Sequence, residues 1–321
     1  MDVLGDILES IHLGGGVRFR CDLGAPWGMN LPRSDHAEFH FVVRGNAWLR
    51  VRGLAQPLPL QGGDFVAMLG GGEHSLLDQP DGLAPPIDEI LGQQALTDYG
   101  PVRFGGDGRS TQLLCGYFSF DRNACHPLVS ALPSLVHLSG SDLPQAAWLQ
   151  TTLQFMQHET QIGRPGAEAV VNRLVGVLFI YMMRRHYELH PDTAGILAGM
   201  ADRHISMALG AMHEAPQTPW SLEMLARRIG LSRSAFAARF HQLVGQTPMQ
   251  YLAVWRMQRA RRLLLDTTLS TAAIAERVGF ESVAAFAKSF KKMLGTPPGA
   301  YRHQRLRNPH DIAVSGITTN T

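Results

Sequence analysis

Ala226-Arg-Arg-Ile-Gly230 and Ala275-Glu-Arg-Val-Gly279 are two copies of one short pattern, and they decide the fold of the C-terminal half. From Phe236 in the first copy and Phe286 in the second the spacings are identical, as the two series show: Phe236, Phe240, Gly245, Pro248 and Tyr251; Phe286, Phe290, Gly295, Pro298 and Tyr301. Apolar residues at helical spacing on both sides of a glycine predict a helix, a tight turn and a second helix. The sequence therefore predicts two helix-turn-helix units.

The region that holds the two units is basic, although the whole chain is nearly neutral. Residues 201–310 contain sixteen Lys and Arg against six Asp and Glu, a balance of +10, whereas residues 1–200 contain thirteen against twenty, a balance of −7. All three lysines, Lys288, Lys291 and Lys292, follow the second glycine turn. A basic patch on paired helix-turn-helix units is the charge distribution expected of a protein that binds duplex DNA.

This region resembles the DNA-binding domain of the AraC family of bacterial transcription regulators. The residues that carry the resemblance are Ile274-Ala275, Val278-Gly279-Phe280, Phe286, Phe290-Lys-Lys292 and Gly295-Thr-Pro-Pro-Gly-Ala-Tyr-Arg302. The resemblance implies double-stranded promoter DNA and RNA polymerase as partners. Activation of transcription is the tendency of this family.

A helix between the two units would fix their separation. A helix from Pro248 to Asp266, at about 1.5 Å per residue, holds the units about 27–30 Å apart. That approaches one turn of B-DNA, about 34 Å, so one chain could place a helix in each of two successive major grooves. The residues expected to face bases are Arg233, Ser234, Ala237 and Ala238 in the first unit and Val283, Ala284, Ala287 and Lys288 in the second.

Other residues of the same region are expected to contact the DNA backbone. We expect Ser232 and Ser282 to meet phosphate through hydroxyl and backbone N–H groups. Arg256 should contact phosphate and so strengthen binding to DNA of any base sequence alike. Lys291 belongs to the basic patch. Apart from Lys288, the second base-facing set cannot bond base edges, so apolar contact and DNA shape would have to supply its specificity.

From Val17 to about Phe120 the pattern changes to short strands separated by Gly, Pro and Asp turns. Strands are expected at 39–43, 47–51, 58–60, 65–69 and 112–120, and such spacing predicts an antiparallel barrel. Phe39-His-Phe-Val-Val-Arg-Gly45, Leu60-Gln-Gly-Gly-Asp-Phe-Val66 and Gly72-Glu-His74 resemble the cupin sensor domain that precedes this DNA-binding domain in many family members. The resemblance implies a domain that receives a small-molecule or oxidant signal.

The chain has three cysteines, Cys21, Cys115 and Cys125. An odd count argues against a structural disulfide framework. Cys21-Asp-Leu-Gly-Ala-Pro-Trp27 and Leu114-Cys-Gly116 are similar to the cysteine contexts of the reactive-chlorine-sensing member of the family, which implies an oxidation-driven pair of Cys21 and Cys115. Burial of both as small apolar residues is the alternative. Cys125 would be a competing partner, and the long segment 78–110 leaves the geometry of the pair open.

An enzyme has to be weighed against a sensor. His36, Glu38 and His40 alternate along a predicted strand, and His74 could join them across the barrel, which would give N and O ligands suited to a first-row metal. The spacing is not diagnostic, because His40 and His74 can equally be satisfied barrel residues or line an effector pocket. We predict no catalytic residue, no bound metal and no cofactor. A metal-dependent cupin enzyme fused to a DNA-binding module, and an architectural DNA-binding protein without signal input, are the alternatives.

The predicted fold is an α+β multidomain protein. It has a cupin-like antiparallel barrel at 1–140, a helical dimerisation or linker region at 141–200, an all-α double helix-turn-helix domain at 201–307 and a flexible tail at 308–321. A short amphipathic helix over residues 1–16 opens the first of these regions. Helices at 144–161 and 167–188 would either carry homodimer contacts or cover the barrel. No apolar run is long enough for a bilayer and the start lacks a signal-peptide pattern, so we expect a cytoplasmic protein without membrane partners.

Overall fold

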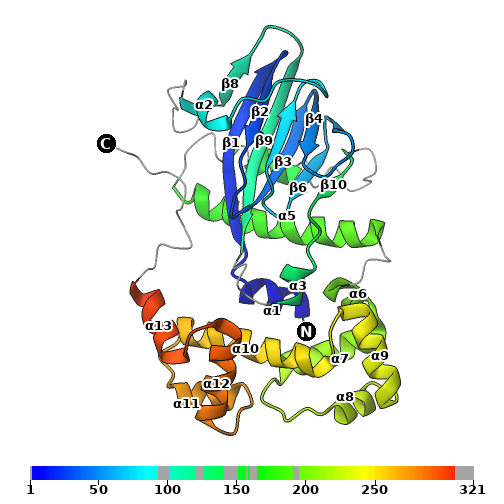
Figure 1. Ribbon diagram of the computed structural model, residues 1–321, viewed down its shortest axis with the longest axis vertical. Coiled ribbons are helices and arrows are strands. Elements are labelled where there is room, and N and C mark those ends of the chain that lie inside the picture. Colours follow the sequence, from blue (N-terminus) through cyan, green and yellow to red (C-terminus); the bar gives the residue numbers. More distant parts are fainter. Residues whose placement is uncertain are drawn as a thin grey trace. The chain divides into compact units, whose positions relative to one another are not determined.

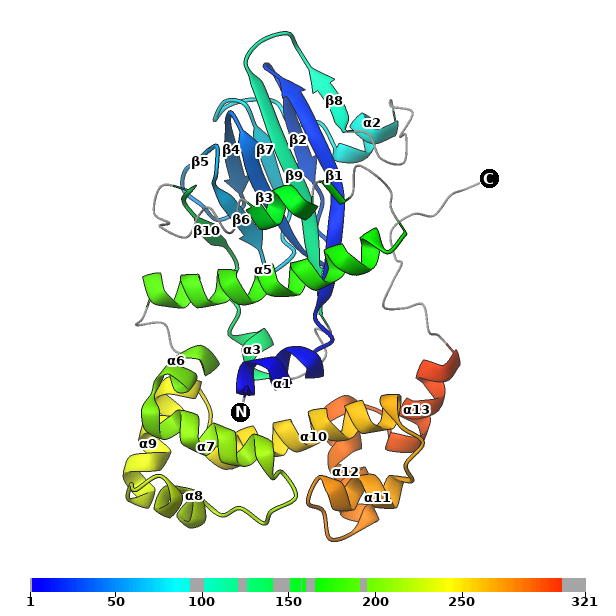
Figure 2. The same cartoon turned by 180° about the vertical axis from the view of Figure 1, so that it is seen from behind.

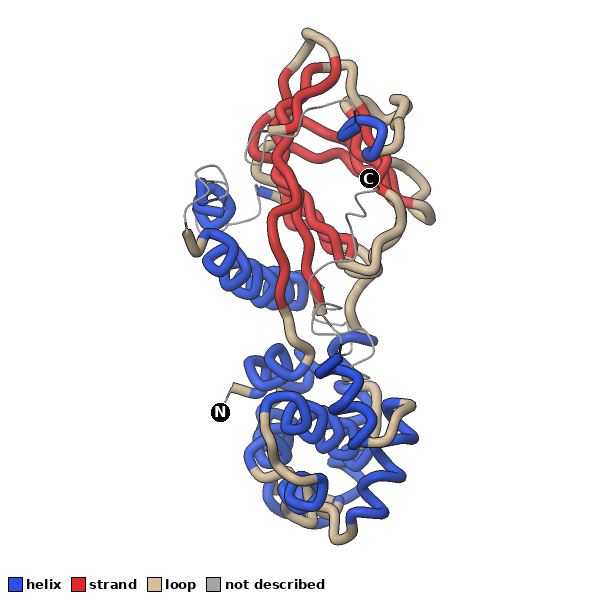
Figure 3. Tube along the Cα trace, turned by 90° about the vertical axis from the view of Figure 1, so that its left-hand side faces the viewer, coloured by secondary structure: helices blue, strands red, loops and turns tan. Residues whose placement is uncertain are grey.

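The computed structural model describes residues 2–92, 101–120, 126–140, 151–156, 158–159, 165–190 and 195–307. The chain divides into two compact units. We call them the helical unit, made of Met1–Ile11, Asp121–Ala131 and Thr193–Thr321, and the barrel unit, made of His12–Phe120 and Leu132–Asp192. The strands all lie in the barrel unit (Figure 3). The predicted tail, the start of the predicted helix at 144–161 and Cys125 lie outside the described residues.

Two sheets build the barrel unit (Figure 1). The first has the order β10 (Val136–Leu138), β6 (Phe65–Met68), β3 (Ala37–Arg44), β9 (Ser110–Ser119), β1 (Gly14–Gly24) and β8 (Val102–Gly105). The second has the order β2 (Gly28–Leu31), β7 (His74–Leu77), β4 (Asn46–Val51) and β5 (Leu58–Gln61). The five predicted strands are β3, β4, β5, β6 and β9, and they pair antiparallel as expected.

Strand β3 is covered on both faces. Phe39 stacks on Phe65 and contacts Phe118, whose ring meets Phe179 of helix α5 (Ala167–Leu189). Helix α5 crosses the outer face of the six-stranded sheet (Figure 2). On the other face of β3, Val42 joins the apolar core between the two sheets. Because successive side chains of a strand alternate, Glu38 and His40 point to this inner side.

The segment 78–110, which the sequence marks as an interruption, contains structure of its own. Helix α2 (Ile87–Gly92) and strand β8 lie within it. Strand β8 pairs parallel with β1, with Val102 opposite Cys21, so one pair departs from the predicted antiparallel pattern. A parallel neighbour needs a long connection, and here residues 25–101 separate the two strands along the chain.

The start of the chain differs from the prediction in extent and in place. Helix α1 runs only from Val3 to Ser10, because Asp2 caps it by accepting the Gly5 N–H and strand β1 already begins at Gly14. Its buried residues include Leu4 and Ile7, and they pack within the helical unit. The structure thus separates α1 from the barrel, whereas the sequence predicts one domain over 1–140.

The helical unit contains two helix pairs held by one long helix. In chain order its C-terminal part has α6 (Ile196–Ala201), α7 (Arg203–Glu214), α8 (Leu222–Arg228), α9 (Arg233–Val244), α10 (Pro248–Asp266), α11 (Thr271–Arg277), α12 (Val283–Leu294) and α13 (Pro298–Arg307). The short helix α3 (Pro127–Ser130) joins the same unit. The pair α8–α9 lies at one end of α10 and the pair α11–α12 at the other (Figure 2). The two predicted helix-turn-helix units are confirmed.

Local signals explain these boundaries. The N-cap side chains of Ser221, Ser232, Thr247, Ser270 and Ser282 each accept the backbone N–H three residues further on, which satisfies a free donor of the first turn. The two tight turns have glycine at positive φ, 71° at Gly230 and 80° at Gly279. No helix among the described residues is both long and apolar enough to cross a bilayer.

Candidate DNA interface and sensor site

The second helices of the two units, α9 and α12, present matching outer faces. Phe236 and Phe240 anchor α9 in the unit, and Phe286 and Phe290 anchor α12; all four side chains are buried. The predicted base-facing residues lie on the opposite side: Arg233, Ser234, Ala238, Val283, Ala284 and Lys288 are exposed, and Ala237 and Ala287 are half-buried. The structure therefore leaves both predicted recognition faces open to a partner.

The two serines before these helices act first as helix caps. Ser232 Oγ accepts the Ala235 N–H at 3.2 Å, and Ser282 Oγ accepts the Ala285 N–H at 3.1 Å. Each hydroxyl keeps its own proton as a donor, and both serines are exposed. The caps leave the first N–H groups of α9 and α12 at the surface, where helix N-termini favour anions such as phosphate.

Helix α10 provides the predicted spacing. It has 19 residues with the predicted bounds Pro248–Asp266, and at about 1.5 Å per residue it is about 28 Å long. Thr247 and Gln250 form a capping box at its start. The length of this helix supports engagement of successive major grooves by the two units.

Arg256 makes intramolecular hydrogen bonds that were not predicted from the sequence. Its Nε donates to the Pro216 carbonyl at 2.7 Å and its Nη2 to the Thr218 carbonyl at 2.8 Å. The side chain is half-buried, and burial lowers the pKa of its guanidinium. Arg256 therefore fastens the connection between α7 and α8, in contrast to the phosphate contact that we predict from sequence. Lys291, in contrast, is exposed on α12.

The basic face of α10 also meets the first helix of the chain. Arg261 is buried, and its Nη2 donates to the Ser10 carbonyl at 3.3 Å. Arg262 forms ion pairs with Glu9 and with Asp266. Both arginines belong to the excess of basic residues over 201–310. The acids of α1, among them Glu9 near its end, are the sequence feature that matches this contact.

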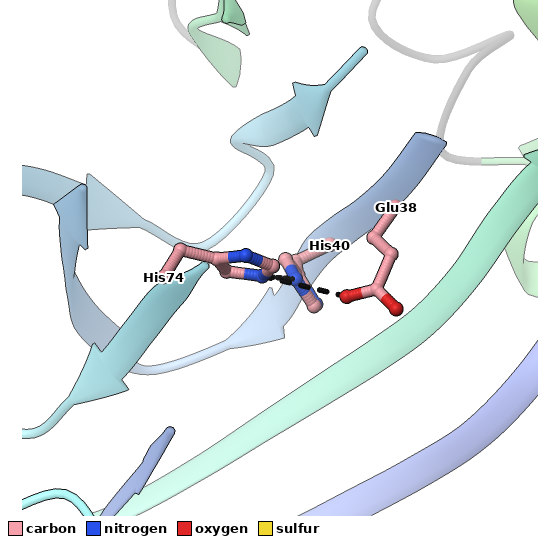
Figure 4. Close-up of side chains that lie close together, drawn as sticks. All are labelled: Glu38, His40 and His74. Atoms are coloured by element: carbon pink, nitrogen blue, oxygen red, sulfur yellow. Dashed lines mark hydrogen bonds and ion pairs between the residues drawn. The ribbon is translucent and has the colours of Figure 1, made fainter. Parts of the chain in front are cut away.

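A compact polar cluster lies inside the barrel unit (Figure 4). Glu38 and His40 come from β3 and His74 from β7, and all three are buried. His40 Nε2 lies 2.8 Å from His74 Nε2, and His74 Nε2 lies 3.8 Å from Glu38 Oε2. Strand alternation predicted the pairing of Glu38 with His40. His36 does not join the cluster. Its ring packs instead against the ring of Tyr117, with 4.8 Å between the two ring centroids.

The hydrogen bonds around the two histidines determine which ring nitrogen of each carries the proton. His74 Nδ1 lies 2.9 Å from the Gly72 carbonyl, which can only accept, so this nitrogen carries the proton. Neutral His74 then accepts at Nε2 from His40 Nε2–H. His40 Nδ1 is left as an acceptor for the Cys115 thiol, whose sulfur is 3.0 Å away. Burial lowers the pKa of both His40 and His74, which favours these neutral forms.

The carboxyl group of Glu38 is the least satisfied member of the cluster. Its Oε1 pairs with Arg18 Nη1 at 3.2 Å, whereas Oε2 is buried without a hydrogen-bond partner. Burial raises the pKa of Glu38, and the Arg18 charge lowers it in part. Arg18 in turn lies 5.5 Å from the centre of the Tyr117 ring. The cluster therefore contains one oxygen that points inward and makes no bond.

The two described cysteines lie beside this cluster as free, buried thiols. In the ladder of β1 and β9, Cys115 is opposite Phe19 and Cys21 is opposite Leu113, so the two sulfur-bearing side chains are diagonal neighbours on one face. Burial raises the pKa of the Cys115 thiol, and its hydrogen-bonding neighbour Cys21 raises it further. Cys21 and Cys115 thus share one core location, and His40 links Cys115 to His74.

Comparison with known proteins agrees with both units. Residues 2–188 match a family model described as Cupin, and residues 225–304 match one described as a helix-turn-helix domain. An AraC-like transcription regulator of Streptomyces lividans is 32% identical over 303 residues, which span 94% of this chain and 98% of that protein. The RCS-specific HTH-type transcriptional activator RclR of Escherichia coli K12 is 29% identical over 201 residues, 63% of this chain and 70% of that protein. The solved DNA-binding domain of AdpA in complex with a target DNA is 35% identical and covers 34% of this chain and 97% of that one, with a TM-score of 0.32.

Proposed function

Since this chain belongs to the AraC family of DNA-binding transcription regulators, we propose that α9 and α12 read its promoter and that the barrel unit supplies the signal. The observation that carries the proposal is the pair of exposed helix faces at the two ends of α10, each anchored by two buried phenylalanines. The relatives are named as regulators, so the chain is a regulator and not the metal-dependent enzyme that its sequence left open.

The two recognition faces would read DNA in different ways. Arg233 and Ser234 at the start of α9 can donate hydrogen bonds to base edges, and Arg is suited to guanine. The equivalent positions on α12 are Val283 and Ala284, which can only pack against thymine methyl groups. Lys288 is the one charged residue in this second set. Specificity on α12 would therefore depend on Lys288, on apolar contact and on DNA shape.

Substitution of Lys288 tests this assignment. Lys288→Ala should lower the ratio of specific to random binding by roughly 5- to 150-fold, because a base contact is worth about 1–3 kcal/mol. Fluorescence anisotropy with a duplex selected from a random pool, and with a scrambled duplex, measures the ratio. Lys292→Ala is the matched control: it should weaken both duplexes alike and reduce the salt slope by about 1. Equal losses on both duplexes for Lys288→Ala would remove the residue from base recognition.

For the signal, we propose oxidation of Cys21 and Cys115 to a disulfide. A two-electron oxidant such as hypochlorous acid takes two electrons, the two thiols release two protons, and one S–S bond forms. The diagonal placement brings the pair near disulfide geometry, since diagonal Cα atoms lie about 7–8 Å apart and a disulfide needs about 4.4–6.8 Å. Closing that gap would move β1 against β9. The raised pKa of Cys115 keeps it protonated, so a strong oxidant is required.

The test compares promoter binding by the purified full chain before and after mild oxidation, with free thiols counted in parallel. Oxidation should remove two thiols and change promoter affinity by about tenfold or more, because a signal acts through the difference in affinity between two conformations. Cys21→Ser and Cys115→Ser should each abolish the change, and Cys125→Ser should keep it. A response that survives both of the first two substitutions would rule out this input.

We also propose RNA polymerase and a second copy of the chain as partners, and the cytoplasm as the cellular location. Contact with RNA polymerase would turn promoter binding into activation. Pairing of two chains would use the outer face of α5, where Val177 is 42% exposed, and sedimentation of the full chain would detect it. A regulator of chromosomal promoters would work in the cytoplasm.

A further inference from the structure

The Glu38, His40 and His74 cluster forms a converging set of ligand atoms. Within the part of the chain that the structure describes, it is the one group of three or more metal-ligating side chains that come together. His40 Nε2, His74 Nε2 and one carboxylate oxygen of Glu38 all lie within 4.8 Å of one another (Figure 4). Two imidazole nitrogens and one carboxylate oxygen are the ligand set of many iron and zinc sites.

The strongest indication is the oxygen that makes no bond. Glu38 is only 3% exposed, and its Oε2 is buried without a hydrogen-bond partner. A buried polar atom left unpaired costs about 1–3 kcal/mol, and more when it is charged. This oxygen faces His74 Nε2 across 3.8 Å. A cation between them would satisfy the oxygen and both nitrogens at once.

The distances suit an ion of first-row size. Bonds of about 2.1 Å place neighbouring ligand atoms roughly 3 to 3.4 Å apart. The contact of 2.8 Å between the two Nε2 atoms is slightly shorter than this, and the 3.8 Å from His74 Nε2 to Glu38 Oε2 is slightly longer. The full set spans up to 4.8 Å, so the ligand atoms have to draw together by roughly 1 Å to seat the ion, which rotations of the three side chains can supply.

The surrounding bonds orient the ligands as metal sites require. The Nδ1–H of His74 donates to the Gly72 carbonyl at 2.9 Å, which directs the Nε2 lone pair into the cluster, as in known histidine ligation. For His40 to bind through Nε2, its one proton has to move to Nδ1. It would then donate to the Cys115 sulfur 3.0 Å away, which would accept in place of donating. Both histidines therefore have a partner for the nitrogen that does not bind metal.

We propose that Glu38, His40 and His74 bind a divalent first-row transition metal ion inside the barrel. Imidazole nitrogen selects Zn²⁺ or Fe²⁺ over Mg²⁺ and Ca²⁺, which prefer all-oxygen sites. Three protein ligands leave at least one coordination position for water or a small anion. The recognition helices contribute no ligand to the site, and Cys115 contacts it through His40. Binding is therefore measured without DNA and with both cysteines reduced.

Equilibrium dialysis tests the proposal directly. The full chain, stripped by a chelator and kept reduced, is dialysed against Zn²⁺ or Mg²⁺ and analysed for bound metal. We expect about one Zn²⁺ per chain and no Mg²⁺. His74→Ala should lose the ion. Glu38→Gln, which keeps the shape of the side chain, should weaken binding by more than about tenfold, because changes in the outer shell alone cost about 10–100-fold.

The control addresses a rival pair of histidines on the surface. His186 and His190 stack at one end of α5 with ring centres 4.5 Å apart, four residues from each other, and such a pair can hold Zn²⁺. The double variant His186→Ala/His190→Ala should keep the buried ion. Circular dichroism of each variant without metal shows whether it has folded.

Three results would overturn the proposal. One is wild-type protein that binds no Zn²⁺ above the level of a folded His74→Ala variant. Another is Glu38→Gln with undiminished affinity. The third is loss of the ion in the His186→Ala/His190→Ala variant. None of these results depends on promoter binding, so a failure here leaves the regulatory proposal standing.

Discussion

Gly279→Ala should lower the free energy of unfolding of the helical unit by about 3–5 kcal/mol, whereas Gly230→Ala should cost only about 1–2 kcal/mol. The two glycines occupy the same turn in the two repeats, and both have positive φ, 80° and 71°. A Cβ at residue 230 meets nothing within 4 Å. A Cβ at residue 279 would lie 2.8 Å from Arg256 Nη2 and 2.9 Å from the Pro216 carbonyl oxygen.

The difference between the two turns arises from Arg256. The backbone carbonyl of Pro216 cannot move alone, because Arg256 ties it and the Thr218 carbonyl to α10. An alanine at 279 would therefore strain the turn and break a charge-assisted hydrogen bond, which is worth about 1.5–3 kcal/mol. Strain at the turn and loss of this hydrogen bond together explain why Gly279→Ala should lower the free energy of unfolding more than Gly230→Ala.

Urea denaturation followed by helical circular dichroism measures both variants. In an Arg256→Ala background the extra penalty at 279 should shrink toward the value at 230, because the side chain that it would displace is absent. Equal costs for Gly279→Ala and Gly230→Ala would show that the turn relaxes freely. That result would also remove the structural role of Arg256.

Most of the helical unit follows from local signals in the sequence. The bounds Pro248–Asp266 agree with the prediction because a capping threonine, a proline at the first turn and a following helix break all act within a few residues. The placement of α1 could not be predicted in this way. Its contacts join Ser10 to Arg261 and Glu9 to Arg262, and pairings across more than two hundred residues leave no periodic trace.

The candidate sites divide in the same manner. Strand alternation placed Glu38 and His40 on one face, and the repeat placed Lys288 opposite Phe286 and Phe290, since both follow from the period of an element. The sequence also offered His36 and His74 for this set, and only the tertiary arrangement decides that His74 of β7 joins Glu38 and His40 while His36 does not. The inward position of Arg256 depends on a loop that no period describes. The periodicity of the sequence therefore predicts which face of a helix or strand a residue lies on. Tertiary contacts decide which residues of that face are left available to bind a partner.

Acidification should lower the free energy of unfolding of the helical unit. The cause is a buried group of aromatic and histidine rings in that unit. His213 Nδ1 lies 3.4 Å from Asp6, its Nε2 lies 2.7 Å from the Tyr251 hydroxyl, and its ring stacks on Trp255 at 3.8 Å. Burial, together with the smaller effects of His126 and Arg259, lowers the pKa of His213 from 6.5 to about 3 in spite of the nearby Asp6 carboxylate. Burial likewise lowers the pKa of His126 to about 3, and its Nδ1 accepts the Leu128 N–H.

Both histidines should make the unit less stable as the pH falls. Below pH 6.5 the unfolded chain binds a proton at each site, while the folded chain stays neutral until about pH 3. Since the unfolded state then holds more protons, stability is complete above pH 6.5 and declines toward pH 3, by up to about 1.4 kcal/mol per pH unit for each histidine. Asp6 opposes this at the acid end, because burial raises its pKa and its protonation favours the folded state.

Urea denaturation at several values between pH 7 and pH 5 measures the slope. His213→Gln keeps a hydrogen-bonding side chain but cannot titrate, so it should reduce the slope by up to about 1.4 kcal/mol per pH unit even though it is less stable at pH 7. His241→Gln, at an exposed position on α9, should leave the slope unchanged. A slope that His213→Gln does not alter would mean that the folded protein accepts the proton at His213. The bond to Asp6 would then outweigh burial, and α1 would be held to the helical unit by an ion pair.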